Sequence, residues 1–313
     1  MRATGARFRG ASEMRRAPPA APPPRRVVYF DRLEVKRVPV YSHSRLSSYE
    51  KCPLQYRYRY LDRIKRDTKS IEAFLGNRVH EVLETLYRDR MASRIASLDE
   101  LLARYHRRWD EEFSEKITIV RTELTADHYR RAGVECVTKY YRRHHPFDDG
   151  TTLGLEDQIT VSLDEGGRYQ LKGYIDRLVR QGGGVYEIHD YKTSNSLPSD
   201  AVLRKDRQLT LYRMAVEKRF PDAREIRLVW HYLVFDRTLT SDRTPHEIEQ
   251  HRRQTMRLID TIEGAKAFPP RESALCGWCE YRDICPVFAA PEPPSEPKPV
   301  HWLDKAEQIS LFK

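Results

Sequence analysis

The chain has 313 residues, with 56 Lys and Arg against 46 Asp and Glu, and its net charge is +10. It is long enough for one domain with a substantial core, and no apolar stretch is long enough for a signal peptide or a membrane span. We therefore expect a cytoplasmic protein with no membrane partner. The positive charge favours an anionic partner such as a nucleic acid, although a well-solvated surface explains much of it.

Residues 1–38 are rich in Arg, Pro and Ala, cannot build a core, and are expected to form a disordered basic tail. Residues 39–288 form the predicted domain. It is helical to about residue 145, has a mixed sheet region from 153 to about 240, and continues as a helix from Pro245 to about Ala267. The predicted fold class is therefore α/β.

The segment from Ser42 to Pro53 is typical of a capped short helix that delivers Cys52. Tyrosine and arginine then alternate through residues 56–60. This run favours two interpretations. It is either a surface that contacts a nucleic-acid strand, or a helix that covers a metal cluster with its tyrosines inward and its arginines outward.

A further helix is predicted around residues 74–87, where His80 lies beside an apolar stripe. A histidine in such a place is often structural. Gly76, one turn earlier, costs helix stability and indicates that another segment approaches closely there.

Residues 168–180 and 185–193 predict two strands of a hairpin, because the glycine-rich turn between them supplies positive φ angles. Folding back at this turn places Asp176 beside His189 and Asp190, within one residue of register. Asp190 and Lys192 leave the same face of their strand. Two carboxylates suit Mg²⁺ or Mn²⁺, and a nearby ammonium group orients a metal-bound water. The alternative is a surface hairpin that carries ordinary charges.

Glu156, in a predicted strand over residues 155–161, is a further candidate acidic partner, although a charged strand edge explains it equally well. A helix over residues 208–220 and a strand over 224–235 follow the hairpin. This order predicts a crossover that returns to the same sheet.

Four of the five cysteines flank the sheet region: Cys52, Cys276, Cys279 and Cys285. They supply one Cys-x-x-Cys knuckle, whereas a zinc ribbon normally has two. A [4Fe–4S] cluster accepts such irregular spacing, and zinc is the alternative. Disulfides are disfavoured in a reducing compartment. Cys136 is interpreted as a buried core thiol.

Four short motifs occur in one order along the chain. They are Gly76 to His80, Gly173 to Arg177, Asp190 to Lys192, and Gln208 to Tyr212. In this order they resemble the RecB-like branch of the PD-(D/E)XK nuclease superfamily, which has a restriction-endonuclease-like mixed sheet flanked by helices. The cysteine pattern is similar to that of its iron–sulfur members, including CRISPR-associated exonucleases and AddB-type nuclease domains.

The resemblance implies a role for each matching residue. His80, Asp176, Asp190 and the Tyr191 carbonyl oxygen would hold Mg²⁺ or Mn²⁺, and Lys192 would be the catalytic lysine. Gln208 and Tyr212 would position the nucleic-acid strand. The four flanking cysteines would bind a structural [4Fe–4S] cluster.

The expected activity is metal-dependent hydrolysis of DNA, preferentially single strands or ends, in repair or recombination. The alternative is a non-catalytic DNA-binding or adaptor protein of the same fold. Residues 289–313 form a proline-rich tail, and its end resembles the peptide by which bacterial repair proteins bind the sliding clamp. Gln308, Leu311 and Phe312 would make that contact. Packing of the tail on its own domain is the alternative.

Overall fold

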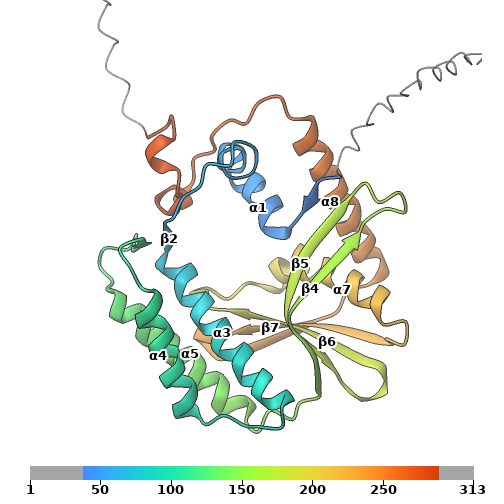
Figure 1. The fold of residues 1–313 in the computed structure, drawn as a ribbon. Helices are drawn as coiled ribbons and strands as arrows, with labels where there is room; N and C mark the ends of the chain where they lie inside the picture. Colours follow the sequence, from blue (N-terminus) through green and yellow to red (C-terminus); the bar gives the residue numbers. More distant parts are fainter. Residues whose placement is uncertain (1–37, 289–313) are drawn as a thin grey trace, which may run out of the picture. The chain divides into compact units, whose positions relative to one another are not determined.

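A six-stranded mixed sheet forms the centre of residues 38–288, which are the residues that the computed structural model describes (Figure 1). Its spatial order is β1 (Val40–Tyr41), β5 (Gln170–Arg180), β6 (Val185–Lys192), β7 (Glu225–Tyr232) and β8 (Arg237–Ser241), and β4 (Thr151–Ser162) also pairs with β5. The pairs β1–β5 and β6–β7 are parallel, and the other pairs are antiparallel.

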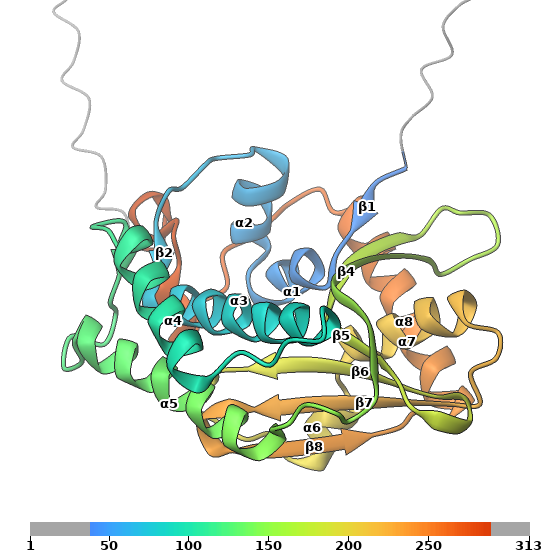
Figure 2. The ribbon, with the colours of Figure 1, turned by 60° about the horizontal axis from the view of Figure 1, so that its bottom comes forward.

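Helices flank the sheet (Figure 2), and two hydrophobic clusters join them to it. One cluster joins α3 (Ile71–Met91), α4 (Leu98–Glu112) and α5 (Ala126–His144) to Tyr191 and Leu233. The other joins α7 (Arg207–Arg219) and α8 (Pro245–Gly264) to the inner residues of β4 to β7. This confirms the predicted α/β class with a mixed sheet flanked by helices.

Shorter elements complete the described part. They are the helices α1 (His43–Lys51), α2 (Pro53–Tyr56) and α6 (Asp200–Arg204), a π-helical turn (Arg57–Leu61), the paired strands β2 (Lys69–Ser70) and β3 (Ile117–Thr118), and 3₁₀ turns at Gly182–Gly184, Leu233–Phe235, Ala274–Trp278 and Arg282–Ile284. Ser42 caps α1 as predicted, because its side chain accepts a hydrogen bond from the Arg45 N–H.

The predicted hairpin and crossover are both present. Gly183 and Gly184 have φ angles of 71° and 81° in the turn between β5 and β6, conformations that glycine adopts without strain. After β6 the chain passes through α7 and returns as β7, parallel to β6. The hairpin and α7 are therefore held on the same sheet.

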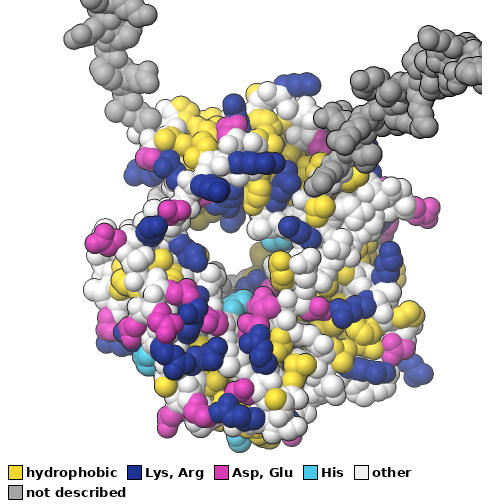
Figure 3. Space-filling view, viewed as in Figure 1, with side chains coloured by type: hydrophobic (Ala, Val, Ile, Leu, Met, Phe, Trp, Pro, Cys, Tyr) yellow, Lys and Arg dark blue, Asp and Glu magenta, His cyan; other side chains and the backbone are white. Residues whose placement is uncertain are grey.

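Figure 3 shows a hollow in one face of the described residues, with acidic and histidine side chains at its lower edge and Lys and Arg side chains above it. Helix α3 runs beside this hollow (Figure 1). Within residues 38–288, none of the helices combines the length and apolar character needed to cross a membrane. The predictions for the basic tail and for the clamp-binding peptide fall on residues 1–37 and 289–313, which lie outside the described residues.

Candidate active site

His80 lies where α3 meets the hairpin of β5 and β6. Its Nε2 atom is 2.9 Å from the backbone oxygen of Tyr191, and its Nδ1 atom is 3.5 Å from a carboxylate oxygen of Asp176. The helix comes this close because Gly76 has no side chain: a Cβ atom there would lie 3.2 Å from Thr193 Oγ1. The close approach predicted from Gly76 is therefore present.

Asp176 and Asp190 lie beside each other on the hairpin. Arg177 pairs with His189 in the antiparallel ladder, so the residues that flank this pair, Asp176 and Asp190, are also opposite each other. The Tyr191 N–H donates a hydrogen bond to Asp176 at 2.8 Å. The predicted register is thus correct, and a backbone donor orients the Asp176 carboxylate.

Glu156 also joins this group. Its carboxylate is 4.0 Å from His80 Nδ1, and one donor atom each of His80, Glu156 and Asp176 lies within 4.8 Å of the others. Glu156 has a left-handed backbone with φ of 46° and lies between Leu155 and Asp157, which pair with Arg177 and Ile175, so it is opposite Asp176. Such a conformation is strained for glutamate, and strained residues of this kind cluster at functional sites.

Lys192 and Gln208, which lies on helix α7, both contact Asp190 of the hairpin. Lys192 Nζ is 2.6 Å from one oxygen of Asp190, and Gln208 Nε2 donates to the other oxygen at 3.2 Å. Gln208 also lies 3.4 Å from the Tyr212 hydroxyl, and Tyr212 packs where a Cβ atom on Gly173 would be only 2.4 Å from its ring. The structure therefore brings together all of the residues predicted for the active site.

The carboxyl groups in this site are protonated more readily than exposed ones. Burial raises the pKa of Asp176 to about 8, and the neighbouring Asp190 adds to this shift. Burial also raises the pKa of Glu156 to about 7, with a further contribution from Asp176. Burial alone would lower the pKa of Lys192, but the adjacent Asp190 outweighs it and holds that pKa above its usual range. A bound cation would relieve the repulsion among these carboxylates.

The donor atoms fit a hard divalent cation. Carboxylate oxygens, a backbone oxygen and an imidazole nitrogen are suitable ligands for Mg²⁺ or Mn²⁺. His80 Nδ1 faces Asp176 and Glu156, while its Nε2 atom lies at hydrogen-bond distance from the Tyr191 oxygen. Asp190 is engaged by Lys192 and Gln208 and lies outside the three-donor group.

A family model for the PD-(D/E)XK nuclease superfamily matches residues 40–286, which is most of the chain. The chain belongs to this superfamily. Nucleases of the PD-(D/E)XK superfamily act on DNA and generally use divalent metal ions, and the donor set above could hold such an ion. No curated protein matches the chain.

Two solved structures are similar to this PD-(D/E)XK protein. The protein SSO0001 is 16% identical with a TM-score of 0.37, and the match covers 78% of this chain and 86% of that one. A candidate exonuclease from Eubacterium rectale is 15% identical with a TM-score of 0.45, covering 82% and 90% of the two chains. At these values the two proteins add nothing to the assignment of activity.

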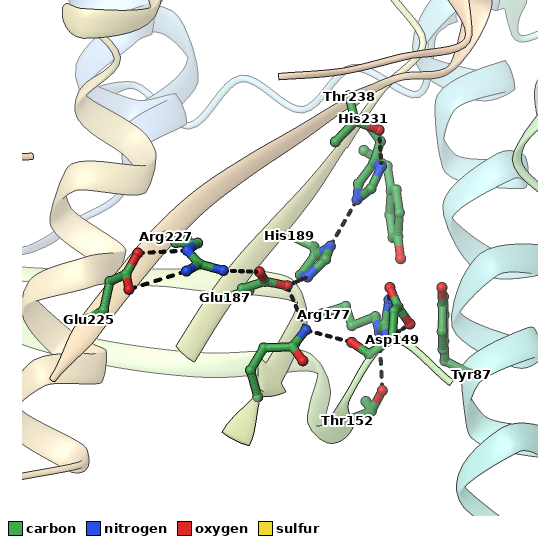
Figure 4. A network of polar contacts seen from close by, with 12 residues as sticks. Tyr87, Asp149, Thr152, Arg177, Glu187, His189, Glu225, Arg227, His231 and Thr238 are labelled. Atoms are coloured by element: carbon green, nitrogen blue, oxygen red, sulfur yellow. Dashed lines mark hydrogen bonds and ion pairs between the residues drawn. The ribbon is translucent and has the colours of Figure 1, made fainter. Parts of the chain in front are cut away.

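A buried arginine fastens the strand that carries Asp176 (Figure 4). The side chain of Arg177 is 1% exposed, and its guanidinium lies 3.5 Å from the centre of the Tyr87 ring on α3. It donates hydrogen bonds to Asp149 at 2.8 Å and to Thr152 on β4 at 3.1 Å. Arg177 thereby joins the three elements that carry His80, Glu156 and Asp176.

The hydrogen bonds continue on the next strands of the PD-(D/E)XK sheet. His189, beside Asp190, contacts Glu187 at 3.3 Å and His231 at 2.8 Å, and His231 contacts Thr238 at 3.2 Å (Figure 4). These contacts join β6 to β7 and β8 next to Asp190. They give the ligand-bearing end of β6 a fixed position.

The four flanking cysteines line one cavity of about 600 Å³. All four thiols are free. Cys52 Sγ accepts a hydrogen bond from the Arg271 N–H, and Cys276 Sγ accepts one from the Ser273 N–H, each at 3.4 Å. The fifth cysteine, Cys136, is buried in α5 as predicted.

The tyrosines of residues 56–60 point inward and the arginines point outward, as expected for a helix that covers a metal cluster. Tyr56 is buried and Tyr58 is partly buried, whereas Arg57 and Arg59 are exposed. The Tyr58 hydroxyl donates to the backbone oxygen of Ile284, next to Cys285, at 3.3 Å. Among the described residues this run therefore covers residues 276–285, which hold three of the four flanking cysteines and are called the cysteine segment below.

Proposed function

We propose that this protein is a RecB-like nuclease that hydrolyses DNA phosphodiesters with Mg²⁺ or Mn²⁺, preferentially on single strands or ends, in repair or recombination. The observation that carries the proposal is the meeting of His80, Glu156 and Asp176 within 4.8 Å, beside the Asp190–Lys192 pair, in a PD-(D/E)XK chain. The hollow beside α3, with cationic side chains above it, supports an extended anionic substrate (Figure 3).

The proposed ligands are His80, Asp176, Asp190 and the Tyr191 oxygen, and Glu156 joins them. A divalent cation held there would activate water and stabilise the charge that develops on the phosphate. Lys192 remains protonated because Asp190 holds its pKa high, so it contributes a fixed positive charge beside the reacting phosphate. Gln208 and Tyr212 would orient the strand from α7.

Digestion of end-labelled single-stranded DNA with Mn²⁺ tests this function. We expect Asp190→Ala and Lys192→Ala each to lower the rate by about 100-fold or more, since each removes a charge at the reacting phosphate. Lys218→Ala, which removes an exposed charge at the far end of α7, should leave the rate unchanged. Undiminished digestion by both site variants would show that the site is wrongly assigned.

The alternative function is a non-catalytic DNA-binding or adaptor protein. The complete set of His80, Asp176, Asp190 and Lys192 disfavours it, because a protein that only binds DNA has no need of all four. Wild-type protein that binds the labelled strand but never cuts it, with either Mg²⁺ or Mn²⁺, would favour this alternative.

We also propose that Cys52, Cys276, Cys279 and Cys285 bind a structural [4Fe–4S] cluster. The shared cavity supports four ligands from the two ends of the domain. The four cysteines supply only one Cys-x-x-Cys knuckle, and this irregular spacing favours an iron–sulfur cluster over a zinc ribbon.

The end of the tail is proposed to bind a sliding clamp through Gln308, Leu311 and Phe312. A proline-rich tether would present a glutamine and two adjacent apolar side chains to a pocket on the clamp. Deletion of residues 308–313 should abolish binding to purified clamp in a pull-down. Clamp binding that persists after the deletion rules the peptide out.

A further inference from the structure

We propose that a basic cavity beside the start of α3 is a second binding site for the substrate strand. The inference rests on the proposed nuclease function and adds residues outside the four motifs. The cavity has a volume of about 890 Å³ and lies between residues 59–70 and the cysteine segment, with Thr118 and Val120 also in its wall. It is larger than the cavity that the four cysteines line.

The cavity carries an excess of positive charge. Its lining cations are Arg59, Arg63, Lys65, Arg66, Lys69 and Arg282, and its lining acids are Asp67, Glu280 and Asp283. Each of the acids already has a cationic partner: Glu280 pairs with Arg59, Asp283 with Arg66, and Asp67 with Lys116.

The remaining four cations are uncompensated. Within residues 38–288, Arg63, Lys65, Lys69 and Arg282 form no ion pair with a carboxylate. Arg63 and Lys65 are also exposed to solvent. Several unpaired cations in one concave site fit a ligand with several negative charges, such as consecutive phosphates.

An exposed aromatic side chain favours a nucleic-acid strand over a small anion as the ligand. Trp278 lines the cavity and is 37% exposed. A partly exposed indole next to cations is the arrangement on which an unpaired base stacks while its phosphates are neutralised. The cavity therefore matches both parts of a single-stranded nucleotide.

One face of α3 connects the cavity with the metal ligands. Ala73 lines the cavity, and Gly76, Asn77 and His80 follow it at spacings of three and four residues, so these side chains share a face. Ala73 and Asn77 are exposed on this face, whereas Thr193 lies against Gly76. We infer that the strand follows Ala73 and Asn77 and passes Thr193 on its way to His80.

The length of this path predicts how far the substrate must extend. His80 is seven residues after Ala73, which is about 10 Å along a helix. At the ~3.4 Å spacing of a stacked strand, this corresponds to about three nucleotides. The cavity would hold the strand about three nucleotides from the phosphate that is cut.

The test is the affinity for a fluorescent single-stranded 20-mer, measured by anisotropy in EDTA over a range of salt concentrations. The variant Arg63→Gln with Lys65→Gln removes two exposed, unpaired cations of the cavity. The matched control, Arg107→Gln with Lys218→Gln, removes two exposed cations from α4 and α7, outside the cavity. Thermal melting of all three proteins confirms that they fold alike.

We expect the cavity variant to bind roughly tenfold more weakly at ~0.1 M salt and to lower the slope of log affinity against log salt by about 1.4, because each lost phosphate contact contributes about 0.7. The control should match the wild type. Equal loss in both variants, or no loss in the cavity variant, overturns this inference while leaving the nuclease assignment intact. A wild-type protein that neither binds nor cuts single-stranded DNA overturns the proposed function itself.

Discussion

Asp176 and Glu156 are proposed metal ligands that also make the stability of the protein depend on pH. Burial raises the pKa of Asp176 to about 8 and that of Glu156 to about 7. The folded protein without metal thus holds protons that the unfolded chain releases from about pH 4 upward. Their contribution to stability is complete below about pH 4 and is lost as the pH rises through about 7 and 8.

Asp176→Asn removes this dependence at one residue, because asparagine does not ionise. In EDTA, the melting temperature of the variant relative to the wild type should therefore rise between pH 5 and pH 8. Saturating Mn²⁺ should reverse the order at pH 8, since the cation binds the ionised wild-type carboxylate and stabilises the folded state. Thermal melts at several pH values measure both effects. A difference that stays constant with pH would contradict the buried position of Asp176.

At the scale of elements, Arg177 is the residue that fastens β5 to α3 and β4. Arg177→Met keeps the bulk but leaves Asp149 without its partner and the Tyr87 ring without its cation. We expect a loss of about 3 kcal/mol in the free energy of unfolding, as for other broken buried ion pairs. Urea denaturation measures this loss.

Arg180→Met is the matched control, because Arg180 ends the same strand and pairs with Asp222 where both side chains are 53% exposed. An exposed pair of this kind contributes less than about 1 kcal/mol. Equal losses in the two variants would mean that the buried network does not fasten the strand.

The sequence predicts the elements whose patterns are local. The glycine turn and the alternating strands specify the hairpin, and the apolar spacing specifies α3 and α7. No local pattern predicts the two-residue strands β1, β2 and β3, because their pairing partners are distant in the chain. The position of Glu156 beside His80 and Asp176 likewise depends on the pairing of β4 with β5, which the residues around Glu156 do not specify.

At the scale of the described chain, hydrogen bonds and ion pairs join the cysteine segment to the N-terminal helices, independently of any bound cluster. Glu280 contacts Arg59 and Gln55, Asp283 contacts Arg66, and the Tyr281 hydroxyl donates to the backbone oxygen of Ile64. These contacts close a loop of more than 200 residues between α2 and the cysteine segment. A cluster bound there would add a covalent link to an interface that is already specified.

Anaerobic purification followed by visible absorption spectroscopy tests this link. We expect a broad visible absorption band from iron–sulfur charge transfer, and its loss in Cys279→Ser. The same variant should melt at a lower temperature, because the ends of the domain lose their bridge. A colourless protein that contains stoichiometric zinc would show that the alternative metal occupies the cysteines.

Anomalous diffraction from crystals grown with Mn²⁺ tests the central claim most directly, because it locates the metal without depending on the choice of substrate. The account predicts an anomalous peak among His80, Asp176, Asp190 and the Tyr191 oxygen, with Glu156 beside it. The peak should be absent in Asp176→Asn crystals treated in the same way. A manganese peak elsewhere, or none at concentrations that support DNA cleavage, would contradict the assignment of this site.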